Sequence, residues 1–155
     1  MTRAVVIPND TVMAYHATTY RVDLPDGQCI ALRIGETNGA LAALHAEHSV
    51  SGSVFVTARN PFGKACSETE NDEAMDHLRA WLQTHGYAWL TGAGTGDDDN
   101  WPPEASVLVL GANEAVADEL CVLFEQNAVV VNGKDAIPRL RPSRCHYVMP
   151  AKTRP

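Results

Sequence analysis

The sequence has no closely spaced cysteines and no long apolar run. Its cysteines are Cys29, Cys66, Cys121 and Cys145, and they form no C-x-x-C pair. Zinc fingers and dithiol redox motifs need such spacing, so the sequence favours neither a structural metal nor a redox centre. No apolar stretch approaches the roughly 18 residues of a membrane-spanning helix, and the first one breaks at Asn9, too early for a signal peptide. These absences predict a soluble, cytoplasmic protein with free thiols and no membrane partner.

Basic residues are scarce except at the end of the chain. The 155 residues include 19 acidic and 12 basic ones, for a net charge of −7. All 19 acidic residues and seven of the basic ones lie in the first 138, a charge of −12, while the end from Arg139 is purely basic. The strong negative charge of the first 138 residues argues against nucleic acid as a partner. We expect a single α+β domain over residues 1–143 and a basic, flexible tail over residues 144–155.

Two alternating segments form the first clear pattern. Apolar and polar side chains alternate over residues 18–24 and again over residues 28–34, on either side of a Pro-Asp-Gly turn. This pattern predicts a β-hairpin. The following residues, 37–48, are rich in alanine and leucine and predict a short helix.

A regular alternation of strands and helices follows the hairpin. Ser67 and Glu70 have the spacing of a capping box and predict the start of a helix that ends at Gly86. After the hairpin and the short helix, the predicted strands are 54–58, 87–91, 106–110 and 128–131, with a short further strand at 137–140. The predicted helices are 67–86 and 113–126, and a loop is predicted at 92–103. From residue 54 to 131 the order is β-α-β-β-α-β, the ferredoxin-like split βαβ arrangement. A small parallel α/β sheet is the alternative.

Several short motifs resemble one bacterial family known only as domain-of-unknown-function family 3293. They are Ala17 to Val22, Val54 to Pro61, Glu70-Asn71, Trp101 to Ser106 and Gln126 to Ala128. Their shared order covers roughly residues 16–140. The sequence departs from the family at two positions, with Arg59 where an aromatic residue is expected and Gly63 where a small hydroxyl residue is expected. The resemblance implies no particular activity.

No motif indicates a metal or a cofactor. His45 and His48 have a spacing that can bind a metal, but no third ligand lies near, so we interpret them as a solvated helix end. Residues 97–100 are acidic without the spacing of a calcium loop, and the glycines at 92–96 lead into no helix that would bind phosphate. No triad spacing surrounds a nucleophile, so catalytic residues stay unassigned. We therefore predict no metal and no cofactor.

Six polar or aromatic residues are candidates for a ligand site. They are Asn60, Glu70, Asn71, Trp101, Glu104 and Gln126. Each also has a purely structural interpretation: a turn, a helix cap, an apolar plug or a helix stop. In the predicted topology, however, the first strand ends beside the beginnings of the third and fourth strands. We therefore expect these residues to meet at one end of the sheet, around a neutral or zwitterionic small polar molecule.

Three classes of function follow from these residues. The first is a small-molecule binding or regulatory module that uses the polar cluster as its pocket. The second is an enzyme with Glu70 and Glu104 as an acid/base pair. The third is a protein-interaction module that presents an open sheet face or edge. The first class is our preferred prediction.

Overall fold

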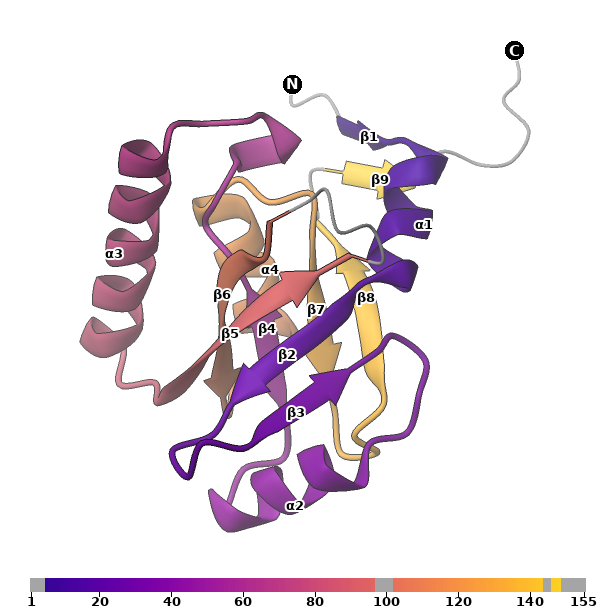
Figure 1. Ribbon diagram of the computed structural model, residues 1–155, viewed down its shortest axis with the longest axis vertical. Helices are drawn as coiled ribbons and strands as arrows, with labels where there is room; N and C mark the ends of the chain where they lie inside the picture. The colour runs from indigo at the N-terminus through magenta and orange to yellow at the C-terminus, as the bar shows by residue number, and fades with distance from the viewer. Residues whose placement is uncertain (1–4, 97–101, 144–145, 149–155) are drawn as a thin grey trace.

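The computed structural model describes residues 5–96, 102–143 and 146–148 (Figure 1). The helices are α1 (Asn9–Ala17), α2 (Gly39–Glu47), α3 (Glu68–Thr84) and α4 (Glu114–Leu123), with a short 3-10 helix η1 (Pro61–Gly63). The strands are β1 (Val5–Ile7), β2 (Thr19–Asp23), β3 (Cys29–Leu32), β4 (Ser53–Val56), β5 (Trp89–Thr95), β6 (Glu104–Leu110), β7 (Ala128–Asn132), β8 (Pro138–Pro142) and β9 (His146–Val148). The fold is α+β.

Seven of the strands form one sheet in the order β3-β2-β5-β6-β4-β7-β8. Every pair of neighbours is antiparallel, so the alternative of a small parallel sheet is wrong. The predicted hairpin is confirmed as β2 and β3, and the predicted short helix as α2. The capping box is confirmed too: Ser67 Oγ accepts from the Glu70 N–H, and Glu70 accepts from the Ser67 N–H.

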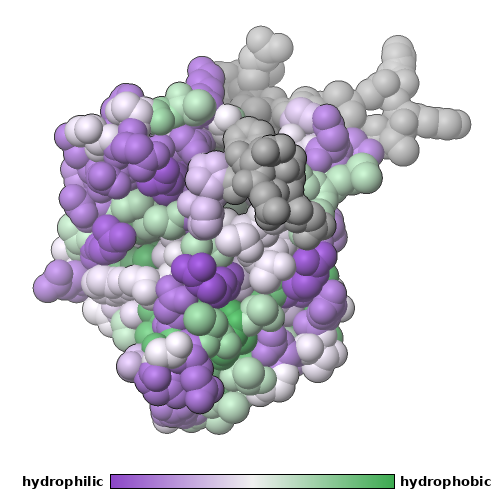
Figure 2. Space-filling model, viewed as in Figure 1, coloured by the Kyte–Doolittle hydropathy of each residue, from purple (hydrophilic) through white to green (hydrophobic). Residues whose placement is uncertain are grey.

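Each face of this sheet has its own apolar core. Helices α3 and α4 cover one face, where they bury alternate valines of the central strands. On the opposite face the hairpin, Phe55, Leu108 and Val130 form a second core, which α2 completes with Leu41 and Leu44. Alternation along the strands thus divides the apolar side chains between the two cores. Figure 2 shows apolar surface in the lower part of the molecule, between the hairpin and α2, on an otherwise mostly polar face.

The sheet curls strongly around this second core. Tyr20 on β2 and Phe55 on β4 are separated by two intervening strands, yet their rings meet edge to face with centroids 5.2 Å apart. The two edges of the sheet are also linked, because the Gly35 N–H after β3 donates to the Pro138 carbonyl of β8 (2.8 Å). In Figure 1 the hairpin accordingly crosses in front of β4 and β7. The curled sheet thus forms a half-barrel, with the second core on its concave face.

Strand β5 is longer than predicted. The expected strand ended at residue 91 and was followed by a glycine-rich loop, but β5 continues to Thr95. A Cβ at Gly92 would lie 2.1 Å from the Arg21 carbonyl oxygen and 3.1 Å from the Phe55 ring. Glycine is therefore required here because β2 and the core approach the β5 backbone closely. The prediction failed because glycine was interpreted as a loop former rather than as a point of close approach.

Both ends of the described chain contain elements that the sequence did not predict. Helix α1 follows β1, and β1 pairs in parallel with β9. Strand β9 lies inside the segment that the sequence predicts to be a flexible tail. Pairing between opposite ends of a chain is a long-range contact, and no local pattern reveals it. None of the described helices is long and apolar enough to cross a membrane.

Candidate functional site

The chain turns sharply after β4, at Asn60. Its backbone has φ of 46°, a left-handed conformation that asparagine adopts more readily than most residues. The Asn60 N–H donates to Asn71 Oδ1 (2.9 Å), and Asn71 Nδ2 donates back to Asn60 Oδ1 (3.1 Å). Asn60 Oδ1 also accepts from the Cys66 N–H (3.1 Å). These two asparagines therefore fasten the loop to the start of α3, and most of their polar atoms are used within the protein.

Glu104, the first residue of β6, faces this loop. Its Oε2 accepts from Asn60 Nδ2 (3.1 Å), whereas no hydrogen bond from the described residues reaches its Oε1. Burial raises the pKa of the Glu104 carboxyl, against the opposing effects of the Asn60 hydrogen bond and the positive charge of Arg59. Glu104 is thus a half-buried carboxyl with one oxygen available to a ligand.

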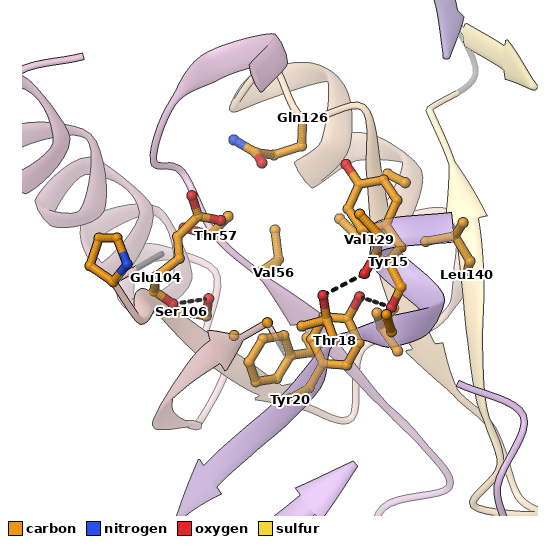
Figure 3. Close-up of a pocket in the computed structure, with 18 residues that line it drawn as sticks. Tyr15, Thr18, Tyr20, Val56, Thr57, Glu104, Ser106, Gln126, Val129 and Leu140 are labelled. Carbon is orange, nitrogen blue, oxygen red and sulfur yellow. Dashed lines mark hydrogen bonds between the residues drawn. The ribbon is translucent and has the colours of Figure 1, made fainter. Parts of the chain in front are cut away.

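Gln126 connects the end of α4 to the end of β4. Its buried side chain donates from Nε2 to the carbonyls of Arg59 (3.1 Å) and Phe124 (3.0 Å). Both amide hydrogens are thereby used, and Oε1 accepts nothing from the described part of the chain. Figure 3 shows the Gln126 side chain projecting from above towards the same hollow as Glu104.

Of the remaining two candidates, Glu70 does not join this cluster. Glu70 is exposed, and hydrogen bonding to Ser67 in the capping box lowers the pKa of its carboxyl. Glu70 lines neither cavity described below, so the geometry does not pair it with Glu104 as acid and base. Trp101 lies outside the described residues.

A cavity of about 500 Å³ opens at the end of the sheet where β4 and β5 end and β2, β6 and β7 begin (Figure 3). Its volume lies within the range of small-molecule sites. The walls are mostly apolar and come from both sides of the half-barrel: Tyr20, Phe55, Val56, Ala128, Val130 and Leu140. Glu104, Thr57 and Gln126 form a polar margin. The open end of the half-barrel is therefore hollow rather than filled by side chains.

A second cavity of about 440 Å³ adjoins the first and is more polar. Arg59, Asn60, Cys66, Asn71 and Asn127 contribute to its lining. Tyr15, Glu104 and Gln126 line both cavities and so form the boundary between them. Four of the six predicted residues, Asn60, Asn71, Glu104 and Gln126, thus lie around adjoining hollows at one end of the sheet.

Helix α1 supplies site residues that the sequence reasoning missed. Burial raises the pKa of Tyr15 to about 12, assisted by the charges of Cys121 and Glu104 and opposed by a hydrogen bond with Asn127. Burial likewise raises the pKa of Tyr20, whose hydroxyl donates to the Tyr15 carbonyl (2.9 Å). Pro8 immediately before the helix and Asp10 in its first turn are helix-start signals that would have located α1.

Arg59 is largely enclosed. Its side chain is 12% exposed and its guanidinium pairs with Glu68 (2.8 Å). Its Nε is buried and has no hydrogen-bond partner among the residues that the structure describes. Arg59 lines the second cavity and not the first, and its positive charge lowers the pKa of Glu104 at the boundary between them.

His45 does not belong to the solvated helix end that the sequence predicted, whereas His48, the C-cap of α2, is exposed as expected. His45 is buried, and its Nε2 lies 2.8 Å from Ser53 Oγ, which also accepts from Asn132 Nδ2 (3.2 Å). Packing of α2 against the concave core turns one face of this alanine-rich helix inward, and His45 lies on that face. Within residues 5–96, 102–143 and 146–148, no group of three or more His, Cys, Asp or Glu side chains is placed to hold a metal ion.

Comparison with known proteins yields one family. The family described as "Protein of unknown function (DUF3293)" matches residues 56–129, from the last residue of β4 to the second residue of β7. No curated protein and no solved structure matches the chain. Over the segment that carries Asn60, Asn71, Glu104 and Gln126, the chain therefore resembles this family of unknown function.

Proposed function

We propose that this protein binds a small molecule in the open end of its half-barrel. The observation that carries the proposal is the cavity of about 500 Å³, with apolar walls and polar groups gathered at one margin. Small-molecule sites combine these two properties, because apolar walls supply affinity and a few polar groups fix the orientation. Glu104 and Gln126 are the proposed ligand contacts in this cavity.

Asn60 and Asn71 have a supporting role in this proposal. Their hydrogen bonds hold the loop after β4 in place and direct Asn60 Nδ2 at Glu104. The six-residue ligand site expected from the sequence is thereby reduced to two direct contacts and two positioning residues. Glu70 acts as a helix cap in this account.

We also propose that β4, α3, β5, β6, α4 and β7 form a ferredoxin-like unit. The order β5-β6-β4-β7 within the sheet, with every neighbour antiparallel, supports this assignment. The β2–β3 hairpin extends the unit on one side and β8 on the other. These additions supply the curvature that creates the cavity.

A neutral fluorescent probe, N-phenyl-1-naphthylamine, tests the binding function. We expect its emission to rise to saturation as protein is added, because the apolar cavity shields it from water. Ala14 is exposed on α1 and lines both cavities, so Ala14→Trp should block the mouth and abolish binding. Met13→Trp is the matched control, since Met13 is its exposed neighbour and lines neither cavity. Absence of saturable binding, or equal binding by Ala14→Trp, would contradict the proposal.

A further inference from the structure

The hydroxyl groups that line the first cavity are already engaged within the protein. Four of them donate to backbone carbonyls: Thr18 to Ala14, Tyr20 to Tyr15, Thr57 to Ala105 and Ser106 to Glu104. The oxygen of the fifth, on Tyr15, faces the Asn127 side chain as an acceptor, an interaction that lowers the pKa of this tyrosine. Because these four donor bonds to carbonyls would have to break before a ligand could use the hydroxyls, the cavity offers few donors to a bound molecule.

Two side-chain acceptor oxygens at the cavity margin, in contrast, are not engaged by the described residues. Gln126 uses both amide hydrogens on carbonyls, which leaves Oε1 as its free atom. Glu104 uses Oε2 on Asn60, which leaves Oε1. Neither of these two oxygens accepts a hydrogen bond from the described residues. A molecule that donates hydrogen bonds complements them.

Charge selects further among such molecules. Glu104 is the only Asp, Glu, Lys or Arg among the described residues that line the first cavity. Tyr20 and Phe55 add aromatic rings to the same walls, and a ring face attracts a cation. Arg59, the nearby positive charge, lines the second cavity instead and is paired with Glu68.

Resting on the proposed binding function, we infer that the ligand is a small amphipathic amine, bound as its ammonium ion. The ammonium group donates to Glu104 Oε1 and Gln126 Oε1, and the apolar body lies against Phe55, Tyr20 and Val130. A charge-assisted hydrogen bond to a carboxylate in a partly buried site is stronger than a neutral one. The charge on Glu104 thus provides selectivity, and the apolar walls accept bodies of varied shape.

Ionisation of Glu104 is coupled to this binding. The titratable and charged groups around it are Arg59 at the end of β4 and the two tyrosines, Tyr15 on α1 and Tyr20 on β2. Burial raises the pKa of the carboxyl, and a bound ammonium lowers it again by stabilising the charged form. Affinity for the ammonium should therefore fall as the pH is lowered and Glu104 becomes protonated.

Three probes with the same aromatic body test the inference: phenethylammonium, 2-phenylethanol and phenylacetate. Their affinities are measured by calorimetry on the full-length protein, beside the naphthylamine titration. We expect phenethylammonium to bind at least tenfold more tightly than either of the others. Glu104→Gln keeps an acceptor for Asn60 but removes the charge, and should eliminate this preference. Glu119→Gln removes an exposed acid of α4 and should leave all three affinities unchanged.

The possible outcomes separate the inference from the function on which it rests. Equal binding of ammonium and alcohol, or a preference that survives in Glu104→Gln, would overturn the amine assignment and leave the cavity as a binding site. Tighter binding of phenylacetate would overturn it in favour of recognition by Arg59. If the naphthylamine binds and phenethylammonium does not, the inference also fails. Failure of all probes, the naphthylamine included, would overturn the binding function itself.

Discussion

Asn71 shows how a single buried amide can determine the shape of the loop beside the cavity. It is 2% exposed, and both polar atoms of its side chain bond the Asn60 turn. Because the Asn60 backbone is left-handed, its N–H and its side chain both hydrogen-bond the side chain of Asn71. The loop conformation is thus determined by hydrogen bonds between side chains and backbone rather than by apolar packing.

Replacing Asn71 by leucine should destabilise the protein by about 1–3 kcal/mol, because the Asn60 N–H loses its acceptor. Leucine has the same branched shape, with two methyl groups in place of the amide oxygen and nitrogen, so the loss reflects the hydrogen bonds rather than a cavity. Urea denaturation of the variant and the parent measures the difference. The control is Asp72→Asn, which alters the exposed neighbour on α3 and should change little. Equal stability of Asn71→Leu would show that the turn does not need this amide.

His45 makes stability depend on pH. Burial lowers the pKa of its imidazole, so between that value and the unfolded value of about 6.5 the folded state binds fewer protons than the unfolded chain. The contribution of neutral His45 to the free energy of unfolding is therefore fully present above pH 6.5 and decreases as the pH falls below that value. Melting curves at pH 8 and pH 5.5 should show a smaller acid-induced drop in His45→Gln than in the parent. An equal drop would contradict the assignment, and His77→Gln, at an exposed position of α3, serves as the control.

At the scale of the elements, two glycines of β5 have different roles. A Cβ at Gly92 would overlap the Arg21 carbonyl of β2, whereas one at Gly94 would meet the Thr18 methyl at an ordinary 3.6 Å. Gly92 therefore allows β2 to pair with β5 and the sheet to curl over Phe55. Gly94 lies farther along the same strand, where it lines the first cavity.

Gly92→Ala should consequently disrupt the pairing of β2 with β5, because the obstructing atom is backbone and cannot rotate away. We expect a large loss of stability, visible as a lower melting temperature and faster amide exchange in the hairpin. Gly94→Ala, the same change two residues away, should fold normally and slightly reduce the space in the cavity. Similar melting temperatures for the two variants would mean that the close approach at Gly92 is not required.

At the scale of the whole molecule, the pairing of β1 with β9 joins the two ends of the described chain. All seven strands of the main sheet lie between these ends, since the last of them, β8, finishes at Pro142. Helix α1 directly follows β1 and contributes Tyr15 to the cavity. The terminal pairing therefore lies next to the helix that forms part of the cavity wall.

Deleting residues 144–155 should leave the sheet folded, with cooperative unfolding retained, because no strand of the main sheet is removed. Hydrogen exchange should nevertheless become faster in residues 5–7, which lose their partner strand, and in α1 next to them. A chain that ends after residue 150 keeps β9 and provides the comparison. Loss of cooperative unfolding in the shorter chain would show that the terminal pairing is needed by the sheet itself.

Local patterns were sufficient wherever the determining contacts are close in sequence. The hairpin follows from alternation around a Pro-Asp-Gly turn, α2 from alanine and leucine, and the start of α3 from the spacing of Ser67 and Glu70. In each case a single element is specified by the chemistry of its own residues.

Sequence order also indicated which segments would share one end of the sheet, and so the neighbourhood of Asn60, Asn71, Glu104 and Gln126. Only the tertiary structure decided what these residues do there. The curl that brings Tyr20 against Phe55, the α1 helix that supplies Tyr15 and the burial of Glu104 depend on contacts between distant segments. Periodicity within a segment specifies which face of it is apolar, but not which segment covers that face or where a space is left. The cavity is such a space.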